Sequence, residues 1–452
     1  MELTRHLLDR IHKLNPRVNA YITVCDEVAL QMALQAEAEL SVRSKRKSRR
    51  DRGSLHGIPI SLKDNFYTKE IRTTAGSKIL RDFVPLHDAP VVASLKKAGV
   101  VILGKTNMHE FAYGVTTENP HFGPTRNPWD LQRIAGGSSG GSAAALAAGL
   151  CYGSIGTDTG GSIRIPASLC GVVGVKPGLA RVNAEDVIPL SPTLDFVGPL
   201  ARTVNDAILL LDPILVREKK EPSLVGRKLP AARVRLARLG IPKEFFLDIV
   251  DPEVRAQFDR ATDLLKKRGA RVKQVSLPEL QQTEAAGNQI AWVEATMYHQ
   301  QAGWFPDHVS EYSEDVYKRL ELGTKVTAVE YLKAQAIRDK FKQQLLEVFS
   351  ASELDALVVP TTPIAAPRIG EASVTINGES HPTRGLLLRL NRPANLAGIP
   401  AISVPCGLTS TGLPVGLQFI AAWTEEALLL EIAREFEEAC QFTARPNLRF
   451  IN

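Results

Sequence analysis

The chain has 452 residues, of which 44% are hydrophobic and 23% are charged, a composition typical of a globular protein with a large core. Five cysteines and no Cys-x-x-Cys pair argue against a disulfide scaffold and a cysteine zinc site, and they indicate a reducing compartment. The formal net charge of +6 is concentrated in segment 41–53, which holds seven basic residues and one acidic residue. We therefore predict a solvated loop there, with a nucleic-acid or membrane contact as the alternative.

The N-terminus predicts an amphipathic helix. Leu3, Leu7 and Ile11 recur at helical spacing, and Pro16 follows the end of the pattern. The segment lacks the apolar stretch and cleavage site of a signal peptide, and no apolar run approaches the roughly 18 residues that span a bilayer. We expect a cytoplasmic protein with no membrane contact.

Further along the chain, predicted strands alternate with predicted helices. Strands are expected at 57–63, 100–104, 171–177, 195–201, 234–242, 270–278, 355–363, 399–407 and 415–422. Helices are expected at 26–40, 90–98, 205–211, 251–268 and 425–440 and within 280–350, and a Pro-rich basic stretch near 213–231 reads as a linker. The alternation predicts an α/β fold with a mostly parallel sheet covered by helices on both faces.

A Gly/Ser run occupies residues 136–142 and leads into the Ala-rich stretch 143–149. This many glycines cannot form a good helix or strand interior, so they predict a sharp turn and a close backbone approach. A flexible linker would not lead into a buried helix. A phosphate-binding loop remains an alternative, although GxxxxGK[ST] is absent.

A second small-residue segment, 156–166, contains a candidate nucleophile. Gly160 and Gly161 precede Ser162, and their backbone N–H groups could face one concavity, as an oxyanion requires. The nine histidines form no obvious motif, so the base that activates this serine must be another group. Lys63, at the end of an apolar strand, is the candidate, because burial lowers the pKa of a lysine.

These segments together resemble the amidase signature family of serine hydrolases. The matching pieces are LHGIPISLKDNF (55–66), GVVILGKTNMHEFA (99–112), FGPTRNPWD (122–130), AGGSSGGSAAALAAG (135–149), GSIGTDTGGSIRIPASLCGVVGVKP (153–177) and NLAGIPAISVP (395–405). The resemblance implies one domain over 1–452 with a large mixed, mostly parallel twisted sheet. Its parts would be a helical N-terminal arm (1–54), a signature core (55–205) and a second half (232–452) that completes the sheet and the substrate pocket.

The resemblance also assigns catalytic roles. Ser162 would be the nucleophile that forms an acyl-enzyme, Ser138 would follow a non-proline cis peptide, and neutral Lys63 would draw a proton through Ser138. The backbone N–H groups of Thr159, Gly160, Gly161 and Ser162 would form the oxyanion hole. No metal or organic cofactor is implied.

The family contains stand-alone amidases and the glutaminase component, or A subunit, of tRNA-dependent amidotransferases. The helix YLKAQAIR (331–338) is similar to that glutaminase, with Arg338 at its glutamine-binding arginine. The acidic residue of the glutaminase, however, is replaced by Leu388. A glutamine ammonium group would then be buried without a partner.

The run Leu386, Leu387 and Leu388 therefore predicts a stand-alone amidase for small, fairly apolar amides, with carbamates (urethanes) or aryl esters as further candidate substrates. The alternatives are the amidotransferase glutaminase and, in another class, a non-catalytic binding protein. Low-specificity signals place Met108, Phe111, Tyr113, Thr116, Trp304, Arg338 and Leu388 at the substrate pocket. The expected partner is a small-molecule amide or carbamate substrate, with no nucleic acid, and a homodimer is one possible assembly.

Overall fold

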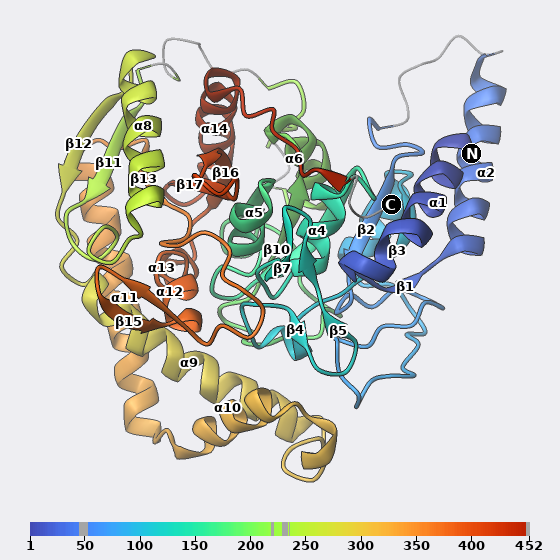
Figure 1. The fold of residues 1–452 in the computed structure, drawn as a ribbon, viewed down its shortest axis with the longest axis horizontal. Helices are drawn as coiled ribbons and strands as arrows, with labels where there is room; N and C mark the ends of the chain where they lie inside the picture. Colours follow the sequence, from blue (N-terminus) through green and yellow to red (C-terminus); the bar gives the residue numbers. More distant parts are fainter. Residues whose placement is uncertain (45–52, 218–220, 228–233, 235, 449–452) are drawn as a thin grey trace.

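The computed structural model describes residues 1–44, 53–217, 221–227, 234 and 236–448. Its centre is one 11-stranded sheet (Figure 1). In spatial order the strands are β1 (Tyr21–Val24), β3 (Val101–Thr106), β2 (Pro59–Lys63), β8 (Gly153–Asp158), β10 (Phe196–Ala201), β9 (Val173–Lys176), β16 (Ala401–Leu408), β17 (Pro414–Ile420), β13 (Ala356–Pro360), β11 (Arg238–Pro242) and β12 (Arg271–Val275). The prediction of an α/β fold built on a large mixed sheet is confirmed.

The pairing within the sheet shows where the strand–helix alternation applies. Parallel neighbours form two blocks, β3–β2–β8 and β13–β11–β12. Every other neighbouring pair of this sheet is antiparallel. The antiparallel centre arises because β9 is followed directly by β10, and β16 by β17, without the crossover helix that parallel strands need.

Helices cover both faces of this sheet, as predicted. One face packs against α3 (Pro90–Lys97), α6 (Val204–Leu211), α8 (Pro252–Lys267) and α14 (Glu426–Cys440). The other packs against α1 (Glu2–Val18), α2 (Asp26–Ser44), α4 (Gly140–Ala147), α5 (Arg164–Cys170), α9 (Leu280–Gln301), α11 (Ala328–Ala351) and α13 (Arg392–Ala397). Successive strand residues alternate between the faces, so Ile102 joins one core while Val101 and Leu103 join the other.

The remaining elements lie outside the central sheet and the helices that cover it. They are α10 (Glu314–Lys325), α12 (Thr383–Arg389), the hairpin β14 (Ser373–Ile376) and β15 (Glu379–Pro382), the short strands β4 (Glu118–Asn119), β5 (Gly123–Pro124), β6 (Arg126–Asn127) and β7 (Asp130–Ile134), and the 3-10 turns η1 (Glu110–Ala112), η2 (Asp212–Ile214) and η3 (Val309–Glu311). In the part of the chain that the structure describes, no helix is both long and apolar enough to cross a membrane.

Two of the predicted connections differ from expectation. The expected basic loop 41–53 begins later than predicted, because α2 continues through Ser44. The rest of that loop, residues 45–52, lies outside the described residues, as do residues 218–220 and 228–231 of the predicted linker. Within the described part of that linker Leu224 is buried, so the stretch contributes to the core.

The start of α4 comes unusually close to the chain around β3. A Cβ built on Gly141 would lie 2.4 Å from the Asn107 carbonyl oxygen and 2.5 Å from the Ala20 carbonyl oxygen. Both atoms belong to the backbone and cannot turn aside. The glycine is therefore what allows the end of the Gly/Ser run to press against the sheet.

We predict that Gly141→Ala destabilises the protein, because the added methyl group must push α4 away from the sheet. Overpacking of this kind costs about 1–3 kcal/mol or more. Thermal unfolding of the purified variant should show a clearly lower midpoint. Gly53→Ala is the control, since a Cβ there meets no atom within 4 Å. Equal midpoints for the two variants would contradict the prediction.

Candidate active site

Lys63, the last residue of β2, is completely buried. Its Nζ donates to Ser138 Oγ at 2.7 Å and to Thr157 Oγ1 at 2.6 Å. Among the described residues it has no carboxylate within ion-pair distance. Burial lowers the pKa of Lys63 to about 7, against the opposing charges of Asp195 and Asp158. A substantial fraction of this amine is therefore neutral near pH 7, and Thr157 is a partner that the sequence analysis missed.

Two loops bring the serines to this amine. The Gly137–Ser138 peptide is cis, and α4 begins two residues later. Ser162 lies between β8 and α5 and is 4% exposed. The Ser139 N–H donates to the Ser162 carbonyl oxygen at 3.1 Å, which fastens the two loops together. Ser138 is bonded to Lys63, and its neighbour Ser139 is bonded to Ser162, so the three predicted catalytic residues lie on adjoining segments although they are distant in sequence.

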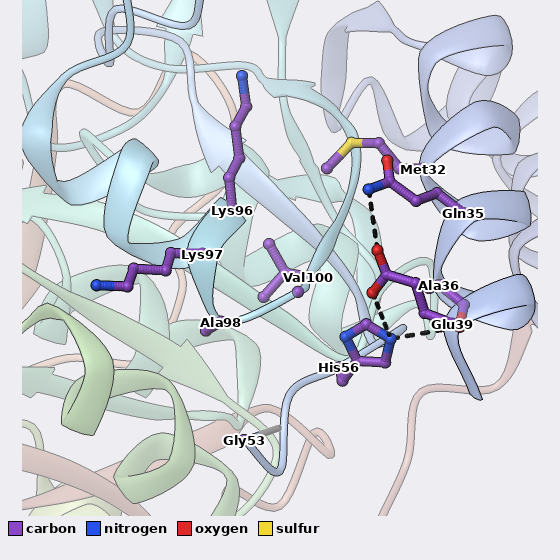
Figure 2. Close-up of a pocket in the computed structure, with 11 residues that line it drawn as sticks. Met32, Gln35, Ala36, Glu39, Gly53, His56, Lys96, Lys97, Ala98 and Val100 are labelled. Atoms are coloured by element: carbon purple, nitrogen blue, oxygen red, sulfur yellow. Dashed lines mark hydrogen bonds and ion pairs between the residues drawn. The ribbon is translucent and has the colours of Figure 1, made fainter. Parts of the chain in front are cut away.

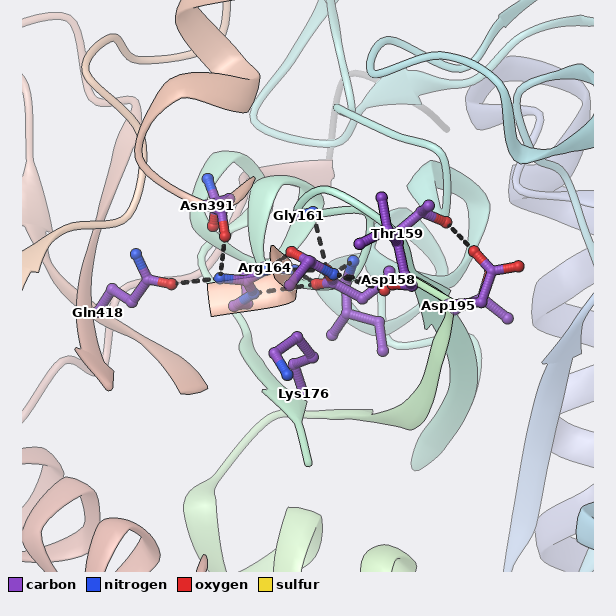
Figure 3. A network of polar contacts seen from close by, with 12 residues as sticks. Asp158, Thr159, Gly161, Arg164, Lys176, Asp195, Asn391 and Gln418 are labelled. Atoms are coloured by element: carbon purple, nitrogen blue, oxygen red, sulfur yellow. Dashed lines mark hydrogen bonds and ion pairs between the residues drawn. The ribbon is translucent and has the colours of Figure 1, made fainter. Parts of the chain in front are cut away.

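The loop that carries Ser162 is organised by a buried ion pair. Asp158 Oδ1 accepts from Arg164 Nη2 at 2.8 Å and from the Gly161 N–H at 2.8 Å (Figure 3). Burial alone would raise the pKa of Asp158, but Arg164 holds it well below its ordinary value. The carboxylate thus stays ionised and fixes the path of the loop between β8 and α5, residues 159–163, which we call the glycine loop or catalytic loop.

Arg164 extends this network into the second half of the chain. It donates to the Asn391 carbonyl oxygen at 3.0 Å, to Gln418 Oε1 at 2.6 Å and to Asn395 Oδ1 at 2.6 Å. These partners come from the turn before α13, from β17 and from α13 itself, respectively. Asp158 and Arg164 thus brace the loop that carries Ser162 against the second half of the chain.

The backbone donors of the glycine loop are not all equivalent. The Gly161 N–H is taken by Asp158, whereas the N–H groups of Thr159, Gly160 and Ser162 have no acceptor among the described residues. Three of the four N–H groups assigned to an oxyanion hole are therefore free to bind an oxyanion. That role stays a prediction.

Asp195 supports the same loop from the other side. It accepts from Thr159 Oγ1 and from the N–H groups of Leu190 and Ser191, the latter two at 2.8 and 3.1 Å respectively. Burial raises its pKa to about 6, so it is mostly ionised at neutral pH. Its charge acts on Lys63 and favours the protonated amine, which keeps the lysine pKa from falling further.

A small inner cavity opens beside Ser162. It is lined by Ala112, Tyr113, Gly114, Val115, Thr159, Gly160, Ser162, Leu190, Ala291, Arg384, Leu388 and Arg392. An outer cavity shares Val115 and Arg384 with it and is also lined by His109, Thr116, Glu118, Asp315, Arg319, Gly370, Glu371, Ala372 and Thr383. Substrate entering from the outer cavity would pass Arg384 before it reaches Ser162.

The structure separates the residues predicted for the substrate pocket. Tyr113 and Leu388 line the inner cavity, and Thr116 lines the outer one. Met108 and Phe111 belong to a buried cluster in which Trp304 stacks on Phe111 at 5.4 Å between ring centroids. These three residues line neither cavity.

Arg338 also lies away from both cavities. It donates to the Leu396 carbonyl oxygen at 3.0 Å, and to Thr193 Oγ1 and the Thr193 carbonyl oxygen at 3.0 and 2.9 Å. These bonds join α11 to the end of α13 and to the loop before β10. In this arrangement the guanidinium group is engaged in holding the scaffold.

Arg384 and Arg392 were not predicted as site residues. Arg392 is 5% exposed, and its aliphatic stem lies against α9, where a Cβ on Gly287 would come within 2.4 Å of its Cδ. Its guanidinium group faces the catalytic loop, since a Cβ on Gly160 would lie 3.3 Å from Arg392 Nε. The sequence did contain a signal, because arginines lie on either side of the leucine run. We interpreted that run only as apolar.

Another hollow lies between α2 and α3, on the N-terminal side of the molecule (Figure 2). Within it Gln35 Nε2 donates to Glu39 Oε1 at 3.0 Å, and His56 Nε2 lies 3.6 Å from Glu39 Oε2. None of the residues that line it belongs to the catalytic loops.

Comparison with known proteins identifies the family. The family model named Amidase matches residues 2–430. The A subunit of the glutamyl-tRNA(Gln) amidotransferase of Geobacter metallireducens is 40% identical over 468 aligned positions, which cover 97% of this chain and 93% of that protein.

The chain belongs to the amidase family.

Solved structures of this family agree with the fold. A chain from a vestigial protein complex that reveals the evolutionary origins of an s-triazine catabolic enzyme is 35% identical, with a TM-score of 0.87, and the match covers 99% of this chain and 96% of that one. The A subunit of the glutamyl-tRNA(Gln) amidotransferase from Thermotoga maritima is 35% identical, with a TM-score of 0.80 and coverage of 99% and 94%. This amidase is therefore a hydrolase of amide C–N bonds, and the predicted resemblance is confirmed.

We predict that Arg164→Met strongly destabilises this amidase, because it leaves the Asp158 carboxylate buried without its cation. Removing one partner of a buried ion pair typically costs about 3–5 kcal/mol. Arg255→Met is the matched control, since it removes a partner of an exposed pair on α8 worth only about 0.3–0.5 kcal/mol. Denaturant unfolding of both variants measures the difference, and similar losses would contradict the central role of the Asp158–Arg164 pair.

Proposed function

We propose that this amidase hydrolyses a small amide through an acyl-enzyme on Ser162. The observation that carries the proposal is the environment of Lys63. Its amine is buried, has no ion-pair partner among the described residues, and is bonded to Ser138 Oγ at 2.7 Å. A lysine in this setting can accept a proton near neutral pH, and the serine beside it can pass one on.

The proposed reaction proceeds in two stages. Ser162 Oγ attacks the amide carbonyl carbon while its proton moves to Ser138, whose own proton moves to Lys63. The free N–H groups of Thr159, Gly160 and Ser162 stabilise the negative oxygen that forms. The relay then returns a proton to the amide nitrogen, the C–N bond breaks, and ammonia or an amine leaves.

Water completes the cycle. It attacks the ester carbonyl of the acyl-enzyme and gives up a proton through the same relay. The Ser162 oxygen leaves the acyl group with a proton, which regenerates the free enzyme and releases a carboxylic acid. No step requires a group outside these residues and water.

The inner cavity gives limited support to the apolar substrates predicted from the leucine run. Leu386, Leu387 and Leu388 all belong to one core cluster, and of the three only Leu388 also lines the cavity. The cavity wall instead includes two arginines, Arg384 and Arg392. We therefore expect the acyl group of the substrate to be small and polar. Carbamates and esters are then expected to be poorer substrates than amides.

A second candidate function is the glutaminase component of a tRNA-dependent amidotransferase. Relatives that cover nearly the whole chain at 36–40% identity carry the name of that amidotransferase, which favours glutamine as the amide. Two observations argue against this function. Leu388 replaces the acidic residue of the glutaminase, and Arg338 forms hydrogen bonds within the scaffold and lines neither cavity. Glutaminase activity that appears only with a partner protein would establish this second function.

We predict that Ser162→Ala abolishes turnover while the fold stays intact, because it removes the attacking oxygen. Hydrolysis of a panel of small primary amides, glutamine included, should fall to background, with an unchanged unfolding midpoint. Ser154→Ala is the control. This buried serine, on the strand that leads to the catalytic loop, donates from its hydroxyl group only to the Ser61 carbonyl oxygen among the described residues. Retained turnover in Ser162→Ala would refute the proposed nucleophile.

We predict that kcat/KM rises with pH through an apparent pKa of about 7 and then levels off, because Lys63 must be neutral to act as the base. The profile is measured with an uncharged amide between about pH 5 and 9, so that the substrate does not titrate. Lys63→Met should lose most of the activity and this rise. Activity that is highest in mild acid and falls toward neutral pH would contradict the assignment.

A further inference from the structure

The inner cavity beside Ser162 contains positive charge that the protein does not neutralise. Among the described residues, neither Arg384 nor Arg392 forms an ion pair, and no carboxylate lines the cavity. Arg392 Nη1 donates to Asn288 Oδ1, but Arg392 Nε is buried without an acceptor. Burying a charge without a partner is costly, so a site that keeps two such groups is suited to an anion.

A third unpartnered group lies in the same wall. Tyr113 Oη is buried without a hydrogen-bond partner among the described residues, as is Arg384 Nε. Burial, with repulsion from Arg319 and Arg392, lowers the pKa of Arg384 to about 9, and burial lowers that of Arg392 to about 10. Asp315, in the wall of the outer cavity, opposes the shift of Arg384, and Glu284 opposes that of Arg392. Both arginines stay protonated at neutral pH.

The position of these groups relative to the catalytic loop limits the ligand. The Arg392 guanidinium group lies next to Gly160, which is itself an expected oxyanion donor. An anionic group bound to Arg392 would therefore belong to the same small molecule whose carbonyl carbon is attacked by Ser162. A planar guanidinium group matches a carboxylate through paired N–H donors.

We propose that this amidase acts on amides whose acyl part ends in a carboxylate, such as dicarboxylic acid monoamides, with Arg384, Arg392 and Tyr113 binding that carboxylate. The inference rests on the proposed function and narrows its substrate. Because no carboxylate lines the inner cavity in the described part of the chain, a neighbouring ammonium group on the substrate finds no partner. Glutamine is therefore a worse substrate than its analogue without the amine.

The test compares three amides of equal carbon number, namely glutaramate, pentanamide and glutamine. Glutaramate and pentanamide differ by a carboxylate in place of a methyl group, and glutamine adds the ammonium group. We expect kcat/KM for glutaramate to exceed that for pentanamide by about ten- to hundredfold, the range given by one or two charge-assisted hydrogen bonds. It should also exceed that for glutamine.

Variants then locate the anion site. Arg384→Gln and Arg392→Gln should each lower the ratio of glutaramate to pentanamide turnover by about tenfold or more. Arg389→Gln is the control, because Arg389 lies in the same helix as Arg384 but stacks on Phe245 at 3.7 Å and donates to its carbonyl oxygen. An unchanged ratio in both cavity variants, or a preference for pentanamide or glutamine, would overturn the inference.

A binding measurement keeps the test independent of turnover. In Ser162→Ala protein, glutaramate should raise the unfolding temperature and pentanamide should not, and adding Arg384→Gln should remove the effect. Ser162-dependent turnover without this stabilisation would overturn the anion site while the proposed function stands. Turnover that survives Ser162→Ala would overturn the proposed function itself, whichever amide is preferred.

Discussion

The buried pair of Asp158 and Arg164 lies where the two halves of the chain meet. Asp158 ends β8 and binds the backbone of the glycine loop, and Arg164 begins α5 and reaches α13 and β17. A carboxylate and a guanidinium group in the core are stable only if their remaining donors and acceptors are satisfied. Here they are satisfied by the elements that form the catalytic loop and the wall of the inner cavity, so the position of Ser162 depends on the packing of the second half of the sheet.

The site contains two kinds of buried cation, and their chemistry separates their roles. A lysine amine can lose its proton when it is desolvated, and Lys63 is bonded to hydroxyl groups that accept or supply protons. An arginine keeps its charge under the same conditions, so Arg384 and Arg392 remain cations in the cavity beside the reacting serine. Desolvation therefore accounts for both proposed roles, a base on one strand of the sheet and an anion-binding wall on two short helices of the second half.

Much of this arrangement could be predicted from the sequence, because the proposed catalytic residues lie in segments of distinctive composition. The glycines before Ser138 and Ser162 indicate tight turns, and Lys63 ends an apolar strand, where burial disfavours a charge. The pairing of β9 with β10 and of β16 with β17 was harder to predict. The sequence of a strand carries little information on its direction, which depends on the connection between strands.

The residues of the cavity wall were still harder to predict from the sequence. Tyr113 packs in the same core cluster as Phe111 and Met108, yet of these three residues only Tyr113 also lines the inner cavity. All three leucines of the short helix α12 pack in one core cluster, and only Leu388 also lines the cavity, so the apolar run concealed the arginines on either side of it. Which face of so short a helix meets a cavity depends on contacts with α9 and the catalytic loop, and those contacts are not visible in the local sequence.

The glycine in α9 beside Arg392 suggests how members of one family can come to differ in their substrates. Gly287 leaves the gap that the arginine stem fills, and a side chain there would occupy the same space. The three atoms nearest to such a methyl group all belong to Arg392, so the guanidinium group would have to move, while the proposed nucleophile lies on another element. If the proposed roles hold, an exchange on α9 changes the selectivity of the enzyme without changing a residue that takes part in bond cleavage.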